Sequence, residues 1–177
     1  MIELLPYDPS WPKEFEREAA RLRTVLADLS IDLHHMGSTA VPGLVAKPVI
    51  DILGVIPDVE ALDQRADAFR SLGYEVMGEY GIPGRRYFRK DDASGRRTHQ
   101  LHAFADGSSE IVRHLDFRDY LRAHASTADA YGKLKQKLAS ECRGDMRCYS
   151  DGKTEFIRDV ERRAAESKGR AHRGAAV

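Results

Sequence analysis

The sequence has few cysteines, no long apolar run and no excess of charge of either sign. Its two cysteines, Cys142 and Cys148, are too few for the disulfide framework of a small secreted protein, and their spacing is not that of a zinc knuckle. We therefore expect two reduced thiols in a cytoplasmic protein. The 28 basic side chains balance the 28 acidic ones, whereas proteins that bind nucleic acids regardless of sequence usually carry a large positive excess. This balance argues against a nucleic acid as the main partner.

The absence of long apolar runs bears on membrane association. No stretch approaches the roughly 18 apolar residues that a membrane-spanning helix requires, and residues 1–6 lack the basic start and apolar core of a signal peptide. The sequence therefore predicts a protein that does not enter a membrane. With 42% hydrophobic and 32% charged residues, the composition excludes a fully disordered, collagenous or coiled-coil chain.

The spacing of apolar residues predicts helices and strands in the first part of the chain, followed by helices alone. The elements expected in the first part are a helix over residues 11–29, strands over 31–36 and 47–56, a helix over 58–72, and strands over 74–80, 85–90 and 97–105. The helices expected after them cover residues 109–124, 127–142 and 151–165. We therefore expect one α/β domain over residues 1–166, with a small mixed sheet and a C-terminal helical cover, and a disordered tail over residues 167–177.

Asp51 is the least expected residue of the most apolar strand. A carboxylate there loses hydration, which is costly unless the group is paired or works at the open end of the sheet. Upstream, Gly37 and Ser38 follow the preceding strand, where a glycine lets backbone N–H groups approach a phosphate and the serine adds a hydroxyl. Together these residues suggest a nucleotide and a metal ion held between two strands. The alternatives are a structural acid with satisfied hydrogen bonds at Asp51 and an ordinary capped turn at Gly37 and Ser38.

The run from His35 to Ile52 closely resembles the GrpB family, which is assigned to the nucleotidyltransferase-like superfamily. Further segments similar to that family lie at residues 9–11, 85–90, 98–102, 131–135 and 149–157. The resemblance extends to about Arg163 and implies a small mixed sheet of the nucleotidyltransferase type. In some bacteria the family occurs fused to dephospho-CoA kinase, which fits a supporting or regulatory role beside that enzyme.

The resemblance also implies which residues form the site. Gly37 and Ser38, with Thr39 beside them, match the turn that binds the nucleoside triphosphate. Asp51 matches the first acid of the pair that holds two divalent cations, but the second acid position is Leu53 in this sequence. One carboxylate with phosphate oxygens suits a single Mg²⁺ or Mn²⁺ ion better than a pair of ions. Asp51 is therefore the expected catalytic residue and metal ligand.

His102 is the best candidate for a second metal ligand. It shares a strand face with Gln100 and Thr98, whereas His99 points to the opposite face. Imidazole suits Mn²⁺, Zn²⁺ or Fe²⁺ better than Mg²⁺. The alternative is a histidine that is hydrogen-bonded at the sheet surface. His114 lies on a strongly polar helix and is interpreted as part of a solvated face.

Basic residues supply further candidates for phosphate binding. Arg85 and Arg86 lie in a strand unusually rich in positive charge, and a guanidinium group can bind two phosphate oxygens at once. The alternative is an edge strand whose charges prevent aggregation. Lys47 precedes the most apolar strand and Lys153 lies near a helix start, which attracts anions, although both could simply be solvated. Lys135 and the lysines on either side of it are interpreted as solubilising residues.

Three hypotheses on function follow from these residues. The first is a metal-dependent enzyme that moves a nucleotidyl or phosphoryl group from a nucleoside triphosphate, with Asp51 at the metal and the Gly37–Ser38 turn at the phosphates. The second is a binding module that holds a nucleotide or a coenzyme-like phosphate ligand without turnover, which Leu53 favours. The third is nucleic-acid binding by the basic C-terminal helices, and it ranks last because the net charge is zero.

Overall fold

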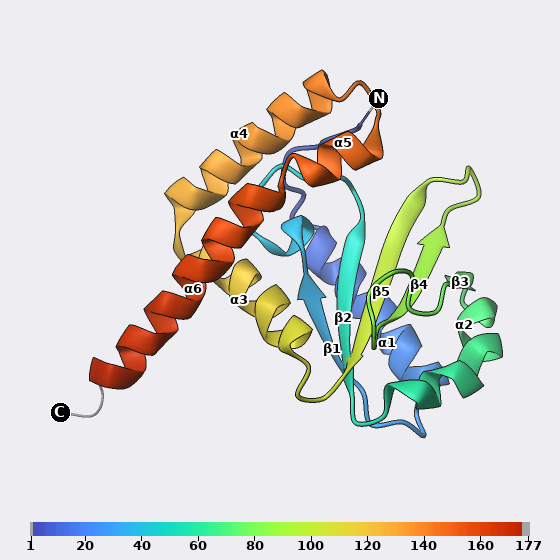
Figure 1. Ribbon diagram of the computed structural model, residues 1–177. Coiled ribbons are helices and arrows are strands. Elements are labelled where there is room, and N and C mark those ends of the chain that lie inside the picture. The colour runs from blue at the N-terminus through green and yellow to red at the C-terminus, as the bar shows by residue number, and fades with distance from the viewer. Residues whose placement is uncertain (1, 175–177) are drawn as a thin grey trace.

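A five-stranded mixed sheet forms the centre of the protein, within the residues 2–174 that the computed structural model describes (Figure 1). In chain order its strands are β1 (Asp32–Met36), β2 (Ile50–Ile56), β3 (Tyr74–Val76), β4 (Arg86–Asp91) and β5 (Arg97–Ala105). Across the sheet the order is β1-β2-β5-β4-β3. β2 runs parallel to β5, and the other neighbouring strands are antiparallel. The expected α/β fold with a small mixed sheet is therefore confirmed.

Helices cover both faces of the sheet. In chain order the helical elements are α1 (Trp11–Val25), η1 (Ser38–Ala40), η2 (Val59–Arg65), α2 (Ala66–Ser71), α3 (Ser109–Ala123), α4 (Ala125–Glu141), α5 (Met146–Asp151) and α6 (Thr154–Gly174). Figure 1 shows α1 against one face, whereas α3 to α6 gather over the opposite face and one end of the sheet. None of the helices in this part of the chain has the length and apolar character needed to span a membrane.

The alternation of side chains along β2 decides what each face of the sheet carries. Ile50, Ile52 and Ile56 join the large apolar core beneath α1, whose buried residues recur at helical spacing. The residues between them point to the other face, where Leu53 joins a smaller apolar cluster beneath α3. Asp51 shares the orientation of Leu53 because the two are separated by two positions along the strand. The carboxylate therefore faces the helical half of the chain.

Two expected elements are shorter or tighter than predicted. Residues 58–72 form η2 followed by α2 instead of one helix. Asp58 caps the start of η2 by accepting a hydrogen bond from the amide of Glu60 at 2.9 Å, which favours a tight turn there. β3 ends before the expected residue 80, because the chain turns at Gly78, whose φ of 62° lies in the left-handed region that glycine readily adopts.

The last helix reaches further than predicted. α6 continues to Gly174, so the segment expected to be disordered from residue 167 is helical as far as residue 174. Lengthening an existing helix adds one hydrogen bond per residue without a new nucleation step, and the segment contains alanine, lysine and arginine, which are good helix formers. The rest of the expected tail, residues 175–177, lies outside the described residues.

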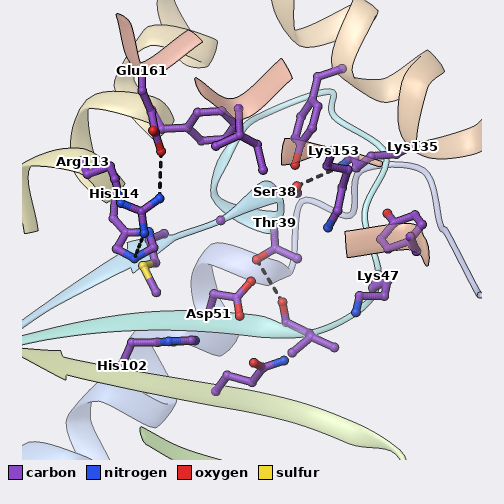
Figure 2. A pocket seen from close by; sticks show the side chains of 18 residues that line it. Ser38, Thr39, Lys47, Asp51, His102, Arg113, His114, Lys135, Lys153 and Glu161 are labelled. Carbon is purple, nitrogen blue, oxygen red and sulfur yellow. Dashed lines mark hydrogen bonds and ion pairs between the residues drawn. The ribbon is translucent and has the colours of Figure 1, made fainter. Parts of the chain in front are cut away.

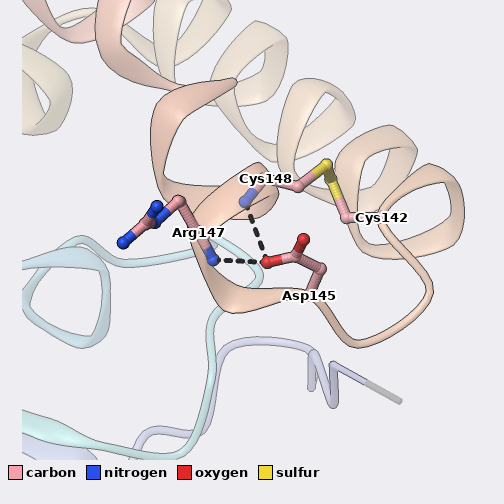
Figure 3. Close-up of a disulfide and its surroundings, with 4 residues drawn as sticks. All are labelled: Cys142, Asp145, Arg147 and Cys148. Carbon is pink, nitrogen blue, oxygen red and sulfur yellow. Dashed lines mark hydrogen bonds between the residues drawn. A yellow bond between two sulfur atoms is a disulfide. The ribbon is translucent and has the colours of Figure 1, made fainter.

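A disulfide joins Cys142 to Cys148, which corrects the expectation of two free thiols (Figure 3). The chain reverses at Arg143 and Gly144, both with positive φ. Asp145 then caps α5, which the sequence analysis did not anticipate, by accepting hydrogen bonds from the amides two and three residues later. This turn places the two cysteine Cα atoms 5.7 Å apart, a separation that a disulfide bridges.

We expect loss of this disulfide to lower the free energy of unfolding. The double change Cys142→Ser and Cys148→Ser removes a cross-link over a sequence separation of six, for which loop-closure entropy gives about 2 kcal/mol. Denaturant unfolding measures the loss, and reductant added to the unchanged protein should reproduce it. Equal stability in all three samples would contradict the structure, as would two titratable thiols in the unreduced, unfolded protein.

Candidate functional site

A cavity of about 330 Å³ lies where the ends of β1 and β2 face the helices α3 to α6. The polar side chains that line it are Ser38, Thr39, Lys47, Asp51, Gln100, His102, Arg113, His114, Tyr131, Lys135, Tyr149, Lys153 and Glu161. Figure 2 shows the three lysines on one side of Asp51, and the two histidines with Arg113 on the other. The lining thus contains four cationic side chains and two carboxylates. Residues that are far apart in the sequence, from Met36 to Glu161, meet in this cavity.

The turn after β1 brings the backbone against the Asp51 carboxylate. Met36 and Asp51 are register partners of β1 and β2, so the residue that follows Met36 lies close to the carboxylate. That residue is Gly37, with φ 72° and ψ −168°, a conformation that is almost confined to glycine. A Cβ atom at this position would lie 2.5 Å from Asp51 Oδ2. The close approach therefore requires glycine.

The Thr39 side chain braces this turn instead of facing a ligand. Its hydroxyl donates to the Val49 carbonyl at 3.3 Å and lies 2.9 Å from His35 Nε2. Because the hydroxyl has one proton, it accepts a hydrogen bond from His35 Nε2. Burial lowers the pKa of His35 to about 4, so the ring is neutral at pH 7. These bonds tie the turn to β2 and hold Ser38 in place.

Lys135 of α4 is the most buried cation of the cavity, with 2% of its surface exposed. Its Nζ donates to Ser38 Oγ at 2.9 Å and to the Val45 carbonyl. Burial lowers the pKa of Lys135 to about 7, and the charge of Lys153 adds to this effect. Burial and the charge of Lys47 likewise lower the pKa of Lys153 to about 8. Both amines would hold their protons more firmly beside an anion.

Asp51 faces these amines. Burial raises the pKa of Asp51 to about 6, and the charges of Lys47, Lys153 and Lys135 oppose this rise, in that order of size. One carboxylate therefore interacts with three lysines across a small space. Positive charge is in excess on this side of the cavity, which suits an anionic ligand.

The opposite side of the cavity is close to neutral. Burial lowers the pKa of His102 to about 3 and that of His114 to about 4, so both rings are uncharged at pH 7. Arg113 forms ion pairs with Glu110 at 2.6 Å and with Glu161 at 2.8 Å. His114, which was interpreted as part of a solvated face, lines the cavity instead. The uncompensated positive charge is thus concentrated around the lysines.

Most of the residues selected from the sequence meet in this cavity, but Arg85 and Arg86 do not. The selected residues that line it are Gly37, Ser38, Thr39, Lys47, Asp51, His102 and Lys153. Arg86 binds both carboxylate oxygens of Asp63, at 2.7 and 2.8 Å. Arg85 donates to two backbone carbonyls and contacts His102 Nδ1 at 3.2 Å. This arrangement does not support a phosphate-binding role for the two arginines, because the protein itself occupies their donors.

Lys135 is the main residue that the sequence analysis missed. It follows the buried residues Ala128 and Tyr131 by seven and four positions, so it continues the inward stripe of α4. Lys133 and Lys137 lie on the outer face and are largely exposed. A charged residue within the apolar stripe of a helix was therefore the signal in the sequence that Lys135 faces inward. Gln100 and the residues from α3 and α5 carried no comparable signal.

The cavity lacks the pair of acids that a two-metal site requires. Leu53, at the second acid position, is 0% exposed and packs with Met36 and Phe104. Nowhere in the described part of the chain do three His, Cys, Asp or Glu side chains gather to hold a metal ion. The amines around Asp51 also repel cations. The residues present do not fit the expected metal pair, because Asp51 is surrounded by lysines and Glu161, the other carboxylate of the cavity, is paired with Arg113.

The sequence is similar to a family model and to several known proteins. The family model described as GrpB protein matches residues 1–163. UPF0157 protein YqkA of Bacillus subtilis is 41% identical over 96% of this chain, which spans 49% of that protein. UPF0157 protein BH1888 of Halalkalibacterium halodurans is 41% identical over 92% of this chain and 82% of its own length. A dephospho-CoA kinase of Mycolicibacterium paratuberculosis is 28% identical over 95% of this chain and 48% of its own length.

Two solved structures are similar to the structure of this chain. The crystal structure of conserved protein GrpB from Enterococcus faecalis has a TM-score of 0.88 and 40% identity, covering 94% of this chain and 99% of that one. The structure of Cid1 in complex with its short product ApU has a TM-score of 0.54 and 17% identity, covering 83% of this chain and 48% of that one. At this low identity the second likeness shows the fold alone, which is that of the nucleotidyltransferases.

We expect Gly37→Ala to destabilise the protein more than Gly43→Ala. Both glycines have positive φ, 72° and 79°. A Cβ atom at position 43 would meet nothing within 4 Å, whereas at position 37 it would meet the Asp51 carboxylate at 2.5 Å. The additional loss for Gly37→Ala should be about 1–3 kcal/mol by urea unfolding. Asp51→Ala should restore part of it. Equal losses for the two glycine variants would contradict the close approach.

Proposed function

This chain belongs to the GrpB family and has the nucleotidyltransferase fold, and from this premise we propose that its cavity binds the phosphate groups of a nucleoside triphosphate or a coenzyme-like ligand. The observation that carries the proposal is the group of three lysines around Asp51. Lys47, Lys135 and Lys153 hold more positive charge than one carboxylate balances. A polyphosphate supplies the missing negative charge and accepts charge-assisted hydrogen bonds from the amines.

The contacts of the lysines support phosphate binding. Lys135 uses two of its three protons on Ser38 Oγ and the Val45 carbonyl, which leaves one proton for a phosphate oxygen. The amines of Lys47 and Lys153 lie 5.9 and 4.3 Å from the ring centroid of Tyr149. These cation–π contacts hold both side chains toward the cavity before a ligand arrives. Preorganised donors lower the entropic cost of binding.

The relatives suggest which phosphate ligands to test. Two proteins named dephospho-CoA kinase, from Mycolicibacterium paratuberculosis and Mycobacterium leprae, contain a segment similar to 95% and 92% of this chain. Coenzyme A precursors therefore join nucleoside triphosphates as candidate ligands. In this first function the protein binds such a ligand and supports or regulates an enzyme that uses it.

A second candidate function is transfer of a nucleotidyl or phosphoryl group from a nucleoside triphosphate to an acceptor. The observation that favours it is the position of Asp51 on β2, beside the Gly37 turn. Asp51 would then be the catalytic residue and would supply one anionic ligand to a Mg²⁺ or Mn²⁺ ion that arrives with the triphosphate. Binding without transfer ranks first, because Leu53 stands at the second acid position and the amines around Asp51 repel cations.

We expect Lys135→Met to weaken polyphosphate binding at least tenfold. A hydrogen bond to a charged group contributes about 1.5–3 kcal/mol, which corresponds to roughly ten- to a hundredfold in affinity. Titration calorimetry with tripolyphosphate, ATP and dephospho-CoA measures the change. Lys133→Met is the matched control, because Lys133 lies on the same helix with 75% of its side chain exposed. Equal affinities of the two variants, or no binding to the unchanged protein, would contradict the proposal.

The two candidate functions predict opposite effects of Asp51→Asn on the affinity for a polyphosphate. If the lysines alone hold the phosphates, Asp51 repels the ligand, and Asp51→Asn should tighten tripolyphosphate binding several-fold in the presence of EDTA. If a metal ion is needed, binding should require added Mg²⁺ or Mn²⁺ and Asp51→Asn should abolish it. Titrations of both proteins with and without metal decide between these results. Metal-dependent binding that Asp51→Asn abolishes would favour transfer.

A further inference from the structure

A second cavity, of about 620 Å³, opens beside the lysine-lined one. The two cavities share Lys47, Val49 and Gln100 in their walls. Val49 directly precedes β2, Lys47 lies two residues earlier, and Gln100 is the β5 register partner of Asp51. The second cavity therefore begins at the same strand ends at which the lysines gather. The three shared wall residues place the two cavities side by side, so one ligand can extend from the first toward the second.

The walls of the second cavity differ in chemistry from those of the first. Aliphatic side chains, including Leu5 and Met146, form much of them. Its two arginines are already paired: Arg96 lies 3.3 Å from an Asp92 carboxylate oxygen, and Arg97 forms an ion pair with Asp91. No aromatic ring lines the cavity among the described residues. It is therefore poorly suited to a second phosphate or to a stacked base, and better suited to an aliphatic chain.

Helix α5 fixes the two cavities relative to each other. Met146 at its start lines the second cavity, and Tyr149, one turn later, lines the first. The disulfide of Cys148 to α4 and the cap by Asp145 hold this short helix (Figure 3). Gln100 lies in the walls of both cavities, at the junction between them. Its side-chain oxygen accepts a hydrogen bond from the Tyr87 hydroxyl at 2.9 Å. Its NH₂ group remains as a donor to an amide or hydroxyl of a ligand.

We propose that the second cavity binds the organic part of the phosphorylated ligand, a flexible aliphatic chain that carries amide or hydroxyl groups, with Lys47 and Gln100 at the junction between phosphate and chain. This inference rests on the proposed phosphate binding in the first cavity. It adds that the phosphates alone account for only part of the affinity. The chain buries apolar surface against Leu5, Val49 and Met146.

The test compares ligands that share the phosphate and differ in the attached group. Titration calorimetry with pyrophosphate, 4′-phosphopantetheine and AMP is carried out on the unchanged protein and on Leu5→Trp and Met146→Trp. Both side chains are partly exposed, 38% and 45%, so the larger ring fills cavity space without displacing the core. Val112→Trp is the matched control, because Val112 is 57% exposed and lines neither cavity.

We expect 4′-phosphopantetheine to bind at least about tenfold more tightly than AMP. Each cavity-filling variant should remove most of this advantage while pyrophosphate binding stays within about twofold, and the control should change nothing. Unchanged phosphopantetheine affinity in both variants overturns the inference but leaves the proposed function intact. An advantage for AMP instead overturns the choice of an aliphatic chain. If pyrophosphate does not bind the unchanged protein, the proposed function fails and the inference fails with it.

Discussion

The gathering of three lysines around one carboxylate, with Lys135 buried among them, is the constraint on which the rest of this structure depends. Removing charged groups from water is costly unless they are paired and hydrogen-bonded. The single charge of Asp51 balances only part of the charge of the three lysines. Lys135 also donates hydrogen bonds to Ser38 and to the Val45 carbonyl. The pKa values of Lys135 and Lys153 are lowered, which means that the protonated amines are still less stable in the cavity than in water. An anionic ligand removes that cost, which is why we regard the cavity as a binding site and not as a feature of the core.

The fold supplies this arrangement through elements that are distant in the sequence. β2 presents Asp51 toward the helices because its alternate residues fill the core beneath α1. The turn at Gly37 comes close enough to place Ser38 beside the amine of Lys135, which α4 carries inward. α5, fixed by the disulfide, adds Tyr149, whose ring holds the amines of two further lysines. The likeness to nucleotidyltransferases extends to the fold, whereas Leu53 stands at the second acid position and three lysines gather around Asp51.

The sequence predicted the part of the site that depends on short segments. Gly37, Ser38 and Asp51 were recognisable because a glycine at a strand end and an acid in an apolar strand are unusual within their own neighbourhoods. Lys135 was not recognised although it continues the stripe of Ala128 and Tyr131, because a lysine in such a stripe reaches a site only through the packing of α4 over the sheet. Arg85 and Arg86 were selected as phosphate-binding residues because no local pattern reveals their partners within the protein. Arg86, for example, forms an ion pair with Asp63, which lies 23 residues away in the sequence. The disulfide likewise depends on a turn whose shape the spacing of its cysteines does not reveal.

The most direct test of the central claim is a titration of the lysine side chains by NMR, with ¹³C-labelled lysine and assignment through Lys135→Arg. We expect one amine, that of Lys135, to titrate near pH 7 in the free protein, because burial and Lys153 lower its pKa. Tripolyphosphate added in EDTA should move this midpoint upward, because the anion stabilises the protonated form. Lysines that all titrate near their ordinary pKa, or a Lys135 midpoint that polyphosphate leaves unchanged, would contradict the account.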